Sequence, residues 1–168
     1  FNFSQNPEIT IEVNPDSADK NYFKELKAIG FNRLSIGSQT FDDDILKLIG
    51  RRHKSEQIIK SVSDAKTAGF ENISLDLIYG LPTQTLKNLK YDLDKFISMD
   101  IQHISTYGLK IEENSYFNKH LPKQLPDEDT QADMYLFINE FLEKSGYKRY
   151  EISNFAKKGF ESKHNLNY

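Results

Sequence analysis

The stretch Gly30-Phe31-Asn32-Arg33-Leu34-Ser35-Ile36 decides the fold, because its pattern returns along the chain. A helix-like segment ends at a glycine, an aromatic and one or two polar residues follow, and a strand-like run then begins. The same order occurs at Gly69-Phe70-Glu71-Asn72 before Ile73-Ser74-Leu75, and at Gly146-Tyr147-Lys148-Arg149 before Tyr150-Glu151-Ile152. Glycine supplies the left-handed backbone conformation that ends a helix. These stretches are therefore predicted to be helix-to-strand junctions.

The segments between the junctions carry apolar residues at helical spacing. They are Phe23, Leu26 and Ile29, then Ile58, Ile59, Val62 and Ala65, then Leu86, Leu89, Leu93 and Phe96. Strands that alternate with helices predict an α/β fold with a parallel sheet, because parallel neighbours need a crossover connection. Residues 114–129 include two prolines and are predicted to form a long loop before a last helix.

Composition limits the functional classes. The 168 residues are 38% hydrophobic and carry a net charge of −3, which fits one globular domain without the basic field that nucleic acids require. There is no cysteine, and the four histidines show no metal-ligand spacing, so no metal site is expected within the chain. No apolar run is long enough for a transmembrane segment, which predicts a cytoplasmic protein. Because the first residue is Phe1, we expect a piece of a longer polypeptide.

The strands have one apolar face and one polar face. Alternation along each strand places Glu12, Gln39, Asp76 and Tyr107 on the face opposite the branched aliphatic residues. An ordinary barrel interior is aliphatic, so this polar lining predicts a hydrated or ligand-filled cavity. The alternative is that these residues satisfy one another or a few water molecules.

Several polar residues allow two interpretations. Glu12 and Asp76 could act as paired carboxylates in acid/base chemistry, or bind ribose hydroxyls or an amino group. Arg51 or Arg52 could bind a carboxylate, or both could complement the negative end of the preceding helix. His164, in a polar tail, fits an exposed bystander better than a ligand when it is considered alone.

Three strings resemble successive strand motifs of the radical S-adenosylmethionine (SAM) proteins of the HemN/HemW family, which includes oxygen-independent coproporphyrinogen oxidases and heme chaperones. They are Ile11-Glu12-Val13-Asn14-Pro15, then Gly30-Phe31-Asn32-Arg33-Leu34-Ser35-Ile36-Gly37-Ser38-Gln39-Thr40-Phe41, then Asp76-Leu77-Ile78-Tyr79-Gly80-Leu81-Pro82. The resemblance implies a partial (β/α) TIM-type barrel, incomplete at its N-terminal side. It also implies SAM and [4Fe–4S] cofactors, with Glu12, Gln39, Arg51 and Asp76 as SAM-contacting residues.

The tail resembles the heme-chaperone branch of that family. Residues 150–156 resemble this branch, and His164-Asn165-Leu166-Asn167-Tyr168 matches the start of its His-Asn-x-x-Tyr-Trp motif, which is associated with heme, although the chain stops before the tryptophan. The resemblance implies that His164 and Tyr168 contact heme. The family's cysteine loop and glycine-rich strand are absent, so this chain alone is expected to be inactive, with no catalytic residue of its own.

The resemblance divides the chain into residues 1–112, a central part of the barrel, and residues 113–168, which lead toward a further HemN-type domain. It implies a fragment of a radical SAM heme chaperone that delivers heme to acceptor proteins. The alternative is an oxygen-independent coproporphyrinogen III dehydrogenase that acts on a porphyrinogen. A second alternative is a cluster-free barrel enzyme that uses Glu12 and Asp76 as paired carboxylates.

Overall fold

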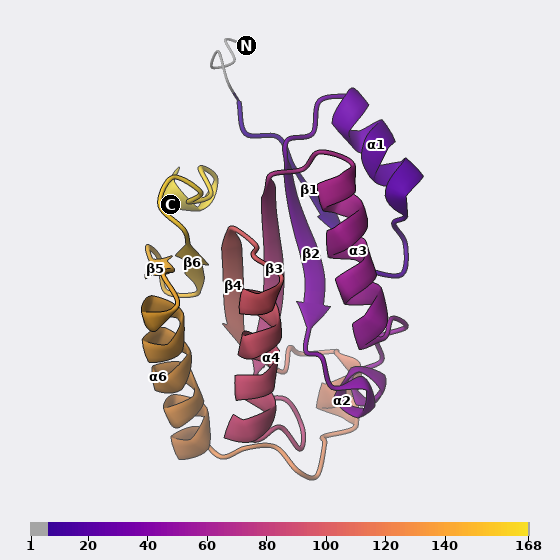
Figure 1. Ribbon diagram of the computed structural model, residues 1–168. Helices are drawn as coiled ribbons and strands as arrows, with labels where there is room; N and C mark the ends of the chain where they lie inside the picture. The colour runs from indigo at the N-terminus through magenta and orange to yellow at the C-terminus, as the bar shows by residue number, and fades with distance from the viewer. Residues whose placement is uncertain (1–6, 168) are drawn as a thin grey trace.

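The computed structural model describes residues 7–167, which form two layers, a β-sheet and a layer of helices (Figure 1). A six-stranded sheet has the order β1-β2-β3-β4-β6-β5, and its first four strands are parallel. The strands are β1 (Thr10–Val13), β2 (Arg33–Gln39), β3 (Asn72–Tyr79), β4 (His103–Gly108), β5 (Lys148–Arg149) and β6 (Asn154–Ala156). The helices are α1 (Lys20–Ala28), α2 (Asp43–Leu48), α3 (Ser55–Thr67), α4 (Leu86–Ser98), α5 (Tyr116–Lys119), α6 (Glu128–Lys144) and the 3-10 turn η1 (Asn165–Asn167).

The hydrophobic core lies between the sheet and the longer helices α1, α3, α4 and α6, which lie along one face of the sheet (Figure 1). The aliphatic strand residues predicted to face helices are fully buried in it, among them Leu34, Ile36, Ile73, Leu75 and Leu77. The parallel α/β prediction is confirmed, and the opposite face of the sheet is left to the polar side chains.

Three apolar residues that the helical spacing assigned to the core are exposed instead. Ile29, Ile59 and Leu86 have 73%, 44% and 42% of their surface accessible. Ile29 is the C-cap of α1 and Leu86 is the first residue of α4, so both lie where a helix end projects beyond the sheet. Helical spacing predicts which side of a helix is apolar, but not how far the sheet extends beneath it.

The strand predicted at residues 150–152 is wrong. The chain forms the short β5 before this segment and β6 after it, and β6 runs antiparallel to both β4 and β5. The Glu151 carboxylate explains the break, since its Oε2 accepts hydrogen bonds from the Ser153 amide at 3.0 Å and from Asn154 Nδ2 at 2.6 Å. These local hydrogen bonds compete with strand pairing and bend the chain.

The loop predicted at residues 114–129 is interrupted by the single-turn helix α5 and ends where α6 begins. The Asp127 side chain caps α6 by accepting a hydrogen bond from the Thr130 amide at 2.8 Å. The sheet runs across the boundary predicted between residues 112 and 113, because β4 pairs with β6.

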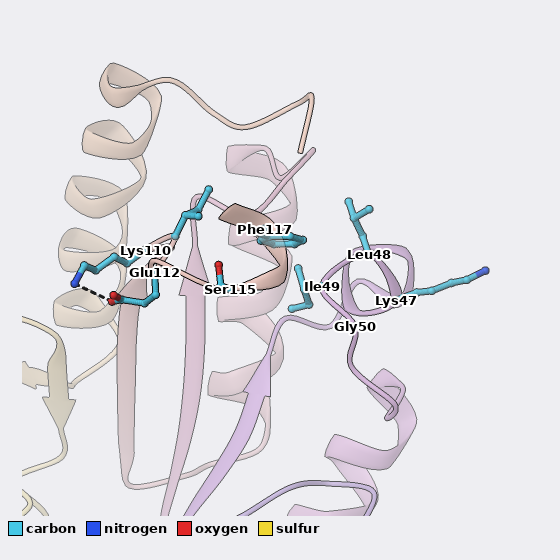
Figure 2. Close-up of a pocket in the computed structure, with 9 residues that line it drawn as sticks. Lys47, Leu48, Ile49, Gly50, Lys110, Glu112, Ser115 and Phe117 are labelled. Atoms are coloured by element: carbon cyan, nitrogen blue, oxygen red, sulfur yellow. Dashed lines mark ion pairs between the residues drawn. The ribbon is translucent and has the colours of Figure 1, made fainter. Parts of the chain in front are cut away.

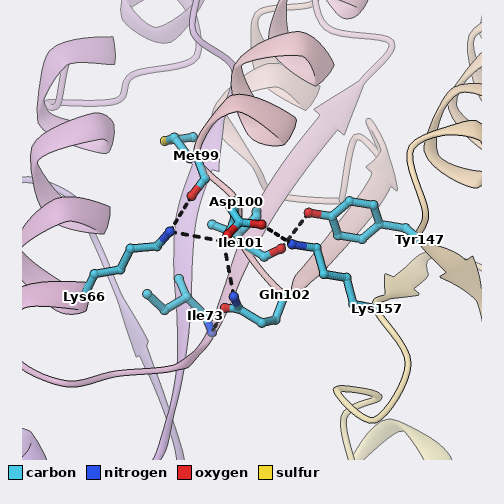
Figure 3. Close-up of polar contacts among 8 residues, drawn as sticks. All are labelled: Lys66, Ile73, Met99, Asp100, Ile101, Gln102, Tyr147 and Lys157. Atoms are coloured by element: carbon cyan, nitrogen blue, oxygen red, sulfur yellow. Dashed lines mark hydrogen bonds and ion pairs between the residues drawn. The ribbon is translucent and has the colours of Figure 1, made fainter.

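The turn between α4 and β4 joins segments that are distant in sequence (Figure 3). Lys66 Nζ of α3 donates to the main-chain oxygens of Met99 and Asp100 at 2.7 and 3.1 Å. The Tyr147 hydroxyl donates to the oxygen of Ile101 at 2.6 Å, and Lys157 pairs with the Asp100 carboxylate. This turn therefore fixes the segment around β5 and β6 against the amino end of β4.

Candidate functional site

The polar face of the sheet centres on Asp76 in β3. Ser35 Oγ of β2 donates to the Asp76 carboxylate at 3.1 Å, and the register pairs Asp76 with Ser105 of β4. Burial raises the pKa of Asp76 to about 6, although hydrogen bonds from Ser35 and Ser105 oppose the shift. Glu12 of β1 also raises this pKa, so the two carboxylates are close enough to repel each other. The predicted pair of acids is therefore brought together on one face.

Gln39 lies at the carboxyl end of β2, just after a bulge in the pairing of β2 with β3. It has a left-handed φ of 60°, which a side chain other than glycine adopts at some cost. Its side chain packs against Gly37, where an added Cβ would lie 3.0 Å from Gln39 Nε2. Gln39 is only 5% exposed, and its Oε1 has no hydrogen-bond partner among residues 7–167. This oxygen is thus positioned to accept a hydrogen bond from a ligand.

Arg51 follows the carboxyl end of α2 and reaches the end of β1. Its Nη1 donates to Asn14 Oδ1 at 3.4 Å, and both residues line a polar hollow of about 290 Å³. The amide of Arg51 also bonds to the Leu46 oxygen, so the cation lies at the negative end of α2 as the alternative interpretation expected. Glu12, Gln39 and Arg51 therefore lie near the carboxyl ends of β1 and β2, and Asp76 lies three residues before the end of β3.

The hydrated or ligand-filled cavity predicted from the strands corresponds to an open face within the described residues. Glu12 is exposed and Tyr107 is 45% exposed, whereas Asp76 and Gln39 are sheltered. A hollow of about 500 Å³ lies beside this face, between the end of α2 and the loop after β4 (Figure 2). It is lined by Lys47, Leu48, Ile49, Gly50, Lys110, Ile111, Glu112, Ser115 and Phe117. Sequence reasoning missed it because only folding places the β4 loop next to α2.

His164 lies at the other end of the sheet. The tail returns to the amino ends of the strands, where Glu8 Oε1 accepts hydrogen bonds from Ser162 Oγ at 3.2 Å and from the Lys163 amide at 3.1 Å (Figure 1). His164 itself is exposed, and Tyr168 lies outside the described residues. The structure therefore does not bring His164 together with the four residues at the carboxyl ends.

Tyr150 holds the tail at this position. Its hydroxyl accepts hydrogen bonds from the Ser162 amide at 3.2 Å and from Asn165 Nδ2 at 3.3 Å, and lies 2.7 Å from His103 Nε2. Burial lowers the pKa of His103 to about 3, which keeps its ring neutral. With its lone pairs occupied, the hydroxyl donates to Nε2, and His103 Nδ1 then donates to Ser74 Oγ at 2.7 Å. Neither His103 nor Tyr150 was selected from the sequence as a site residue.

Arg33 is a further residue that sequence reasoning missed. It is 5% exposed at the start of β2, and its Nε has no hydrogen-bond partner among the described residues. No ion pair joins it to a carboxylate within residues 7–167. Its charge nevertheless lowers the pKa of both Asp76 and His103, so it lies between the two ends of the polar face.

Residues 7–167 contain no group of three histidine, aspartate or glutamate side chains arranged to hold a metal ion. Within the same part of the chain, no helix combines the length and the apolar character needed to cross a bilayer.

Comparisons with known proteins agree with this geometry. Residues 3–96 match the radical SAM superfamily. The chain is 46% identical over 164 residues to the heme chaperone HemW of Bacillus subtilis, and 44% identical over 164 residues to that of Lactococcus lactis. Each alignment covers 96% of this chain and 43% of the relative, so the chain spans less than half the length of these proteins.

The solved structure of coproporphyrinogen III oxidase (HemN) from Escherichia coli, a radical SAM enzyme, is also similar. It superposes with a TM-score of 0.86 at 30% identity, over 96% of this chain and 38% of that one. This likeness confirms the predicted fold class, a part of a radical SAM TIM-type barrel. The chain belongs to the radical SAM superfamily, and within it is similar to the proteins of the HemN/HemW family.

Proposed function

We propose that these residues form the central part of a radical SAM heme chaperone, which binds SAM at the carboxyl ends of the strands and heme at their amino ends. The observation that carries the proposal is the separation of the two groups of candidate residues. Glu12, Gln39, Arg51 and Asp76 lie at one end, and the tail with His164 lies at the other. Similarity to the HemW heme chaperones supports heme as the ligand of the tail.

The residues at the carboxyl ends fit SAM chemically. The unpartnered Gln39 Oε1 can accept a hydrogen bond from the amino group of the methionine moiety, and the carboxylates of Glu12 and Asp76 can accept hydrogen bonds from the ribose hydroxyls. Arg51 can pair with the methionine carboxylate in its polar hollow. When bound to a reduced iron–sulfur cluster, SAM supplies one-electron chemistry.

The [4Fe–4S] cluster does not fit the residues present, because the 168 residues contain no cysteine. The thiolate ligands of such a cluster would have to come from another segment. We propose that residues 1–112 form the barrel part that completes the SAM site. Residues 113–168 then connect it to a HemN-type domain and carry the heme-binding tail, to which Tyr168 would contribute.

The separation supports the proposal that heme is carried by this protein and is not its reactant. Asp76 lies four residues after the first residue of β3, and strands rise about 3.3 Å per residue, so Asp76 is about 13 Å from the amino end of its strand. Reacting groups must approach to about 3–3.5 Å. A heme bound at His164 would therefore stay out of reach of chemistry at the SAM site and could be passed unchanged to an acceptor protein.

The hollow of about 500 Å³ favours a second candidate, an oxygen-independent coproporphyrinogen III dehydrogenase. It lies at the same end as the SAM residues. Lys47 and Lys110 are among its lining residues, and Lys110 is paired with Glu112 at 2.8 Å, so a porphyrinogen carboxylate would have to replace Glu112 there. Structural similarity to coproporphyrinogen III oxidase supports this candidate. The raised pKa of Asp76 beside Glu12 supports the third candidate, acid/base chemistry without a cluster.

The test uses the product of the complete reading frame that contains these residues, purified without oxygen and reconstituted with iron and sulfide. Heme and SAM are titrated separately by absorbance, with His164→Ala and the neighbouring exposed Lys163→Ala as a matched pair. We expect stoichiometric heme binding that only His164→Ala removes, SAM binding in both variants, and no turnover of coproporphyrinogen.

Three outcomes would contradict parts of this proposal. Turnover of coproporphyrinogen without heme binding would establish the dehydrogenase. Heme binding that survives His164→Ala would remove the tail from the heme site. Activity without iron that is lost in Glu12→Gln would favour the acid/base enzyme.

A further inference from the structure

Asp92 is a buried acid that the proposed site does not use. It lies in α4, has no exposed surface, and belongs to the apolar side of the helix between Leu89 and Phe96. Its carboxylate accepts hydrogen bonds from Thr40 Oγ1 at 2.8 Å and from the Phe41 amide at 2.7 Å. Thr40 and Phe41 directly follow Gln39. Asp92 is therefore hydrogen-bonded to the turn next to the Gln39 side-chain amide, which is proposed to bind SAM.

Packing alone does not account for an acid at this position. Burial raises the pKa of Asp92 to about 7, and the charge of Asp42 raises it further against the hydrogen bonds of Thr40 and Phe41. Burying a carboxylate costs free energy relative to an apolar side chain of similar size, so stability alone does not explain Asp92. The explanation lies in the segment that the acid holds.

That segment is strained. Gln39 adopts a φ of 60°, and β2 pairs irregularly with β3 between Ile36 and Gln39. Such a conformation persists only where the surroundings impose it. The two hydrogen bonds that Asp92 accepts fix the residues immediately after Gln39, and Thr40 Oγ1 also accepts a hydrogen bond from the Asp42 amide at 3.1 Å. The turn is thereby held on the side away from the polar face.

Gln84 extends the same contact to the next strand. It lies beside Asp92 and lowers the pKa of that acid by hydrogen bonding. Its Nε2 donates to the Ile78 oxygen at 3.3 Å, and its Oε1 accepts from the Leu81 amide at 3.2 Å. Asp92 therefore joins the segment after Gln39 to the end of the strand that carries Asp76.

We propose that Asp92 is a positioning residue, which holds the turn at Thr40 and Phe41 so that Gln39 Oε1 points toward SAM. This inference rests on the proposed function, because it assumes that the ligand at the carboxyl ends is SAM. The acid itself touches no ligand and acts only through Gln39.

The experiment changes Thr40, which separates the hydrogen bond from the acid. Thr40→Val keeps the shape and removes the hydroxyl, whereas Thr40→Ser keeps the hydroxyl. Val62→Ala, on the buried side of α3, serves as a control for general loss of stability. Each variant is made in the complete, reconstituted protein. SAM affinity is read from the change in the electron paramagnetic resonance spectrum of the reduced cluster, and hydrogen exchange of the Phe41 amide reports the turn.

We expect Thr40→Val to weaken SAM binding about tenfold and to speed exchange at Phe41, with Thr40→Ser and Val62→Ala within about twofold of the wild type. Equal affinities of the valine and serine variants, or an equal loss in Val62→Ala, would overturn the inference. A wild-type protein that fails to bind SAM would overturn the proposed function and this inference with it. That result differs from the others because it appears before any substitution is made.

Discussion

Replacing Tyr150 by phenylalanine removes the hydroxyl that anchors the tail. The ring keeps its place beside His103, whose centroid lies 5.7 Å from it, so packing changes little. The substitution deletes the hydrogen bonds from Ser162 and Asn165 and leaves His103 Nε2 without its donor. The loss therefore falls on polar contacts alone.

The cost follows from the geometry of these contacts. The two accepted bonds are long, at 3.2 and 3.3 Å, and each contributes no more than about 1 kcal/mol. The third is short, at 2.7 Å, and its loss leaves a buried acceptor of the neutral His103 unpaired, which costs about 1–3 kcal/mol. We expect a total of about 2–4 kcal/mol, which for a protein of this size lowers the melting temperature by roughly 4–16 °C.

The assay combines thermal unfolding of the 168-residue chain with a heme titration of the complete protein. Tyr91→Phe is the matched control, because this tyrosine is 51% exposed on α4 and lies far from the tail in sequence. Tyr150→Phe should weaken heme binding as well as stability, since Ser162 and Asn165 flank His164. If both tyrosine variants melt within about 1 °C of the wild type, the polar contacts at Tyr150 do not hold the tail and the reasoning is refuted.

Three further outcomes are expected. Asp76→Asn removes the carboxyl group whose pKa is raised. The unfolded carboxyl ionises near pH 3.8 and the folded one near pH 6, so the free energy of unfolding of the wild type, relative to this variant, should fall by about 2 kcal/mol as pH rises from 4 to 6. A difference that stays constant in chemical denaturation at both pH values would contradict the shift. Arg33→Met removes a buried cation that has no ion pair within residues 7–167, so it should be neutral or stabilising by about 1–4 kcal/mol in the 168-residue chain. A clear loss in the free energy of unfolding measured in urea would show that Arg33 has a stabilising partner. Gly37→Ala should weaken SAM binding roughly tenfold with little change in melting temperature, because the new Cβ displaces Gln39 Nε2; unchanged affinity would separate Gln39 from the ligand.

Much of the fold could be predicted from the sequence, because local chemistry determines it. Gly30, Gly69 and Gly146 all have the left-handed φ that the junction pattern requires, and each ends a helix. Alternation along the strands correctly separated core residues such as Ile73 from polar ones such as Asp76. Such patterns depend only on neighbours in the chain.

The direction of β6 could not be predicted, because it depends on a bend made by Glu151 and on pairing with β4, about fifty residues earlier. The tail and the SAM residues lie toward opposite ends of the sheet, and this arrangement also depends on contacts between distant parts of the chain. The sequence selected His164 and Gln39 as separate motifs, but only the packed sheet shows which end each occupies. Asp92 was missed because a lone acid on a helix gives no sign of the turn that it holds.

The contact between Glu8 and Ser162 has a consequence for how the protein assembles. These residues are 154 positions apart, and a hydrogen bond of that span forms only after the intervening chain has lost most of its freedom. The segment around His164 should therefore take its place late in folding, after the parallel strands have paired. A ligand that needs this segment would then distinguish a finished molecule from a nascent one, and its capture would report that folding is complete.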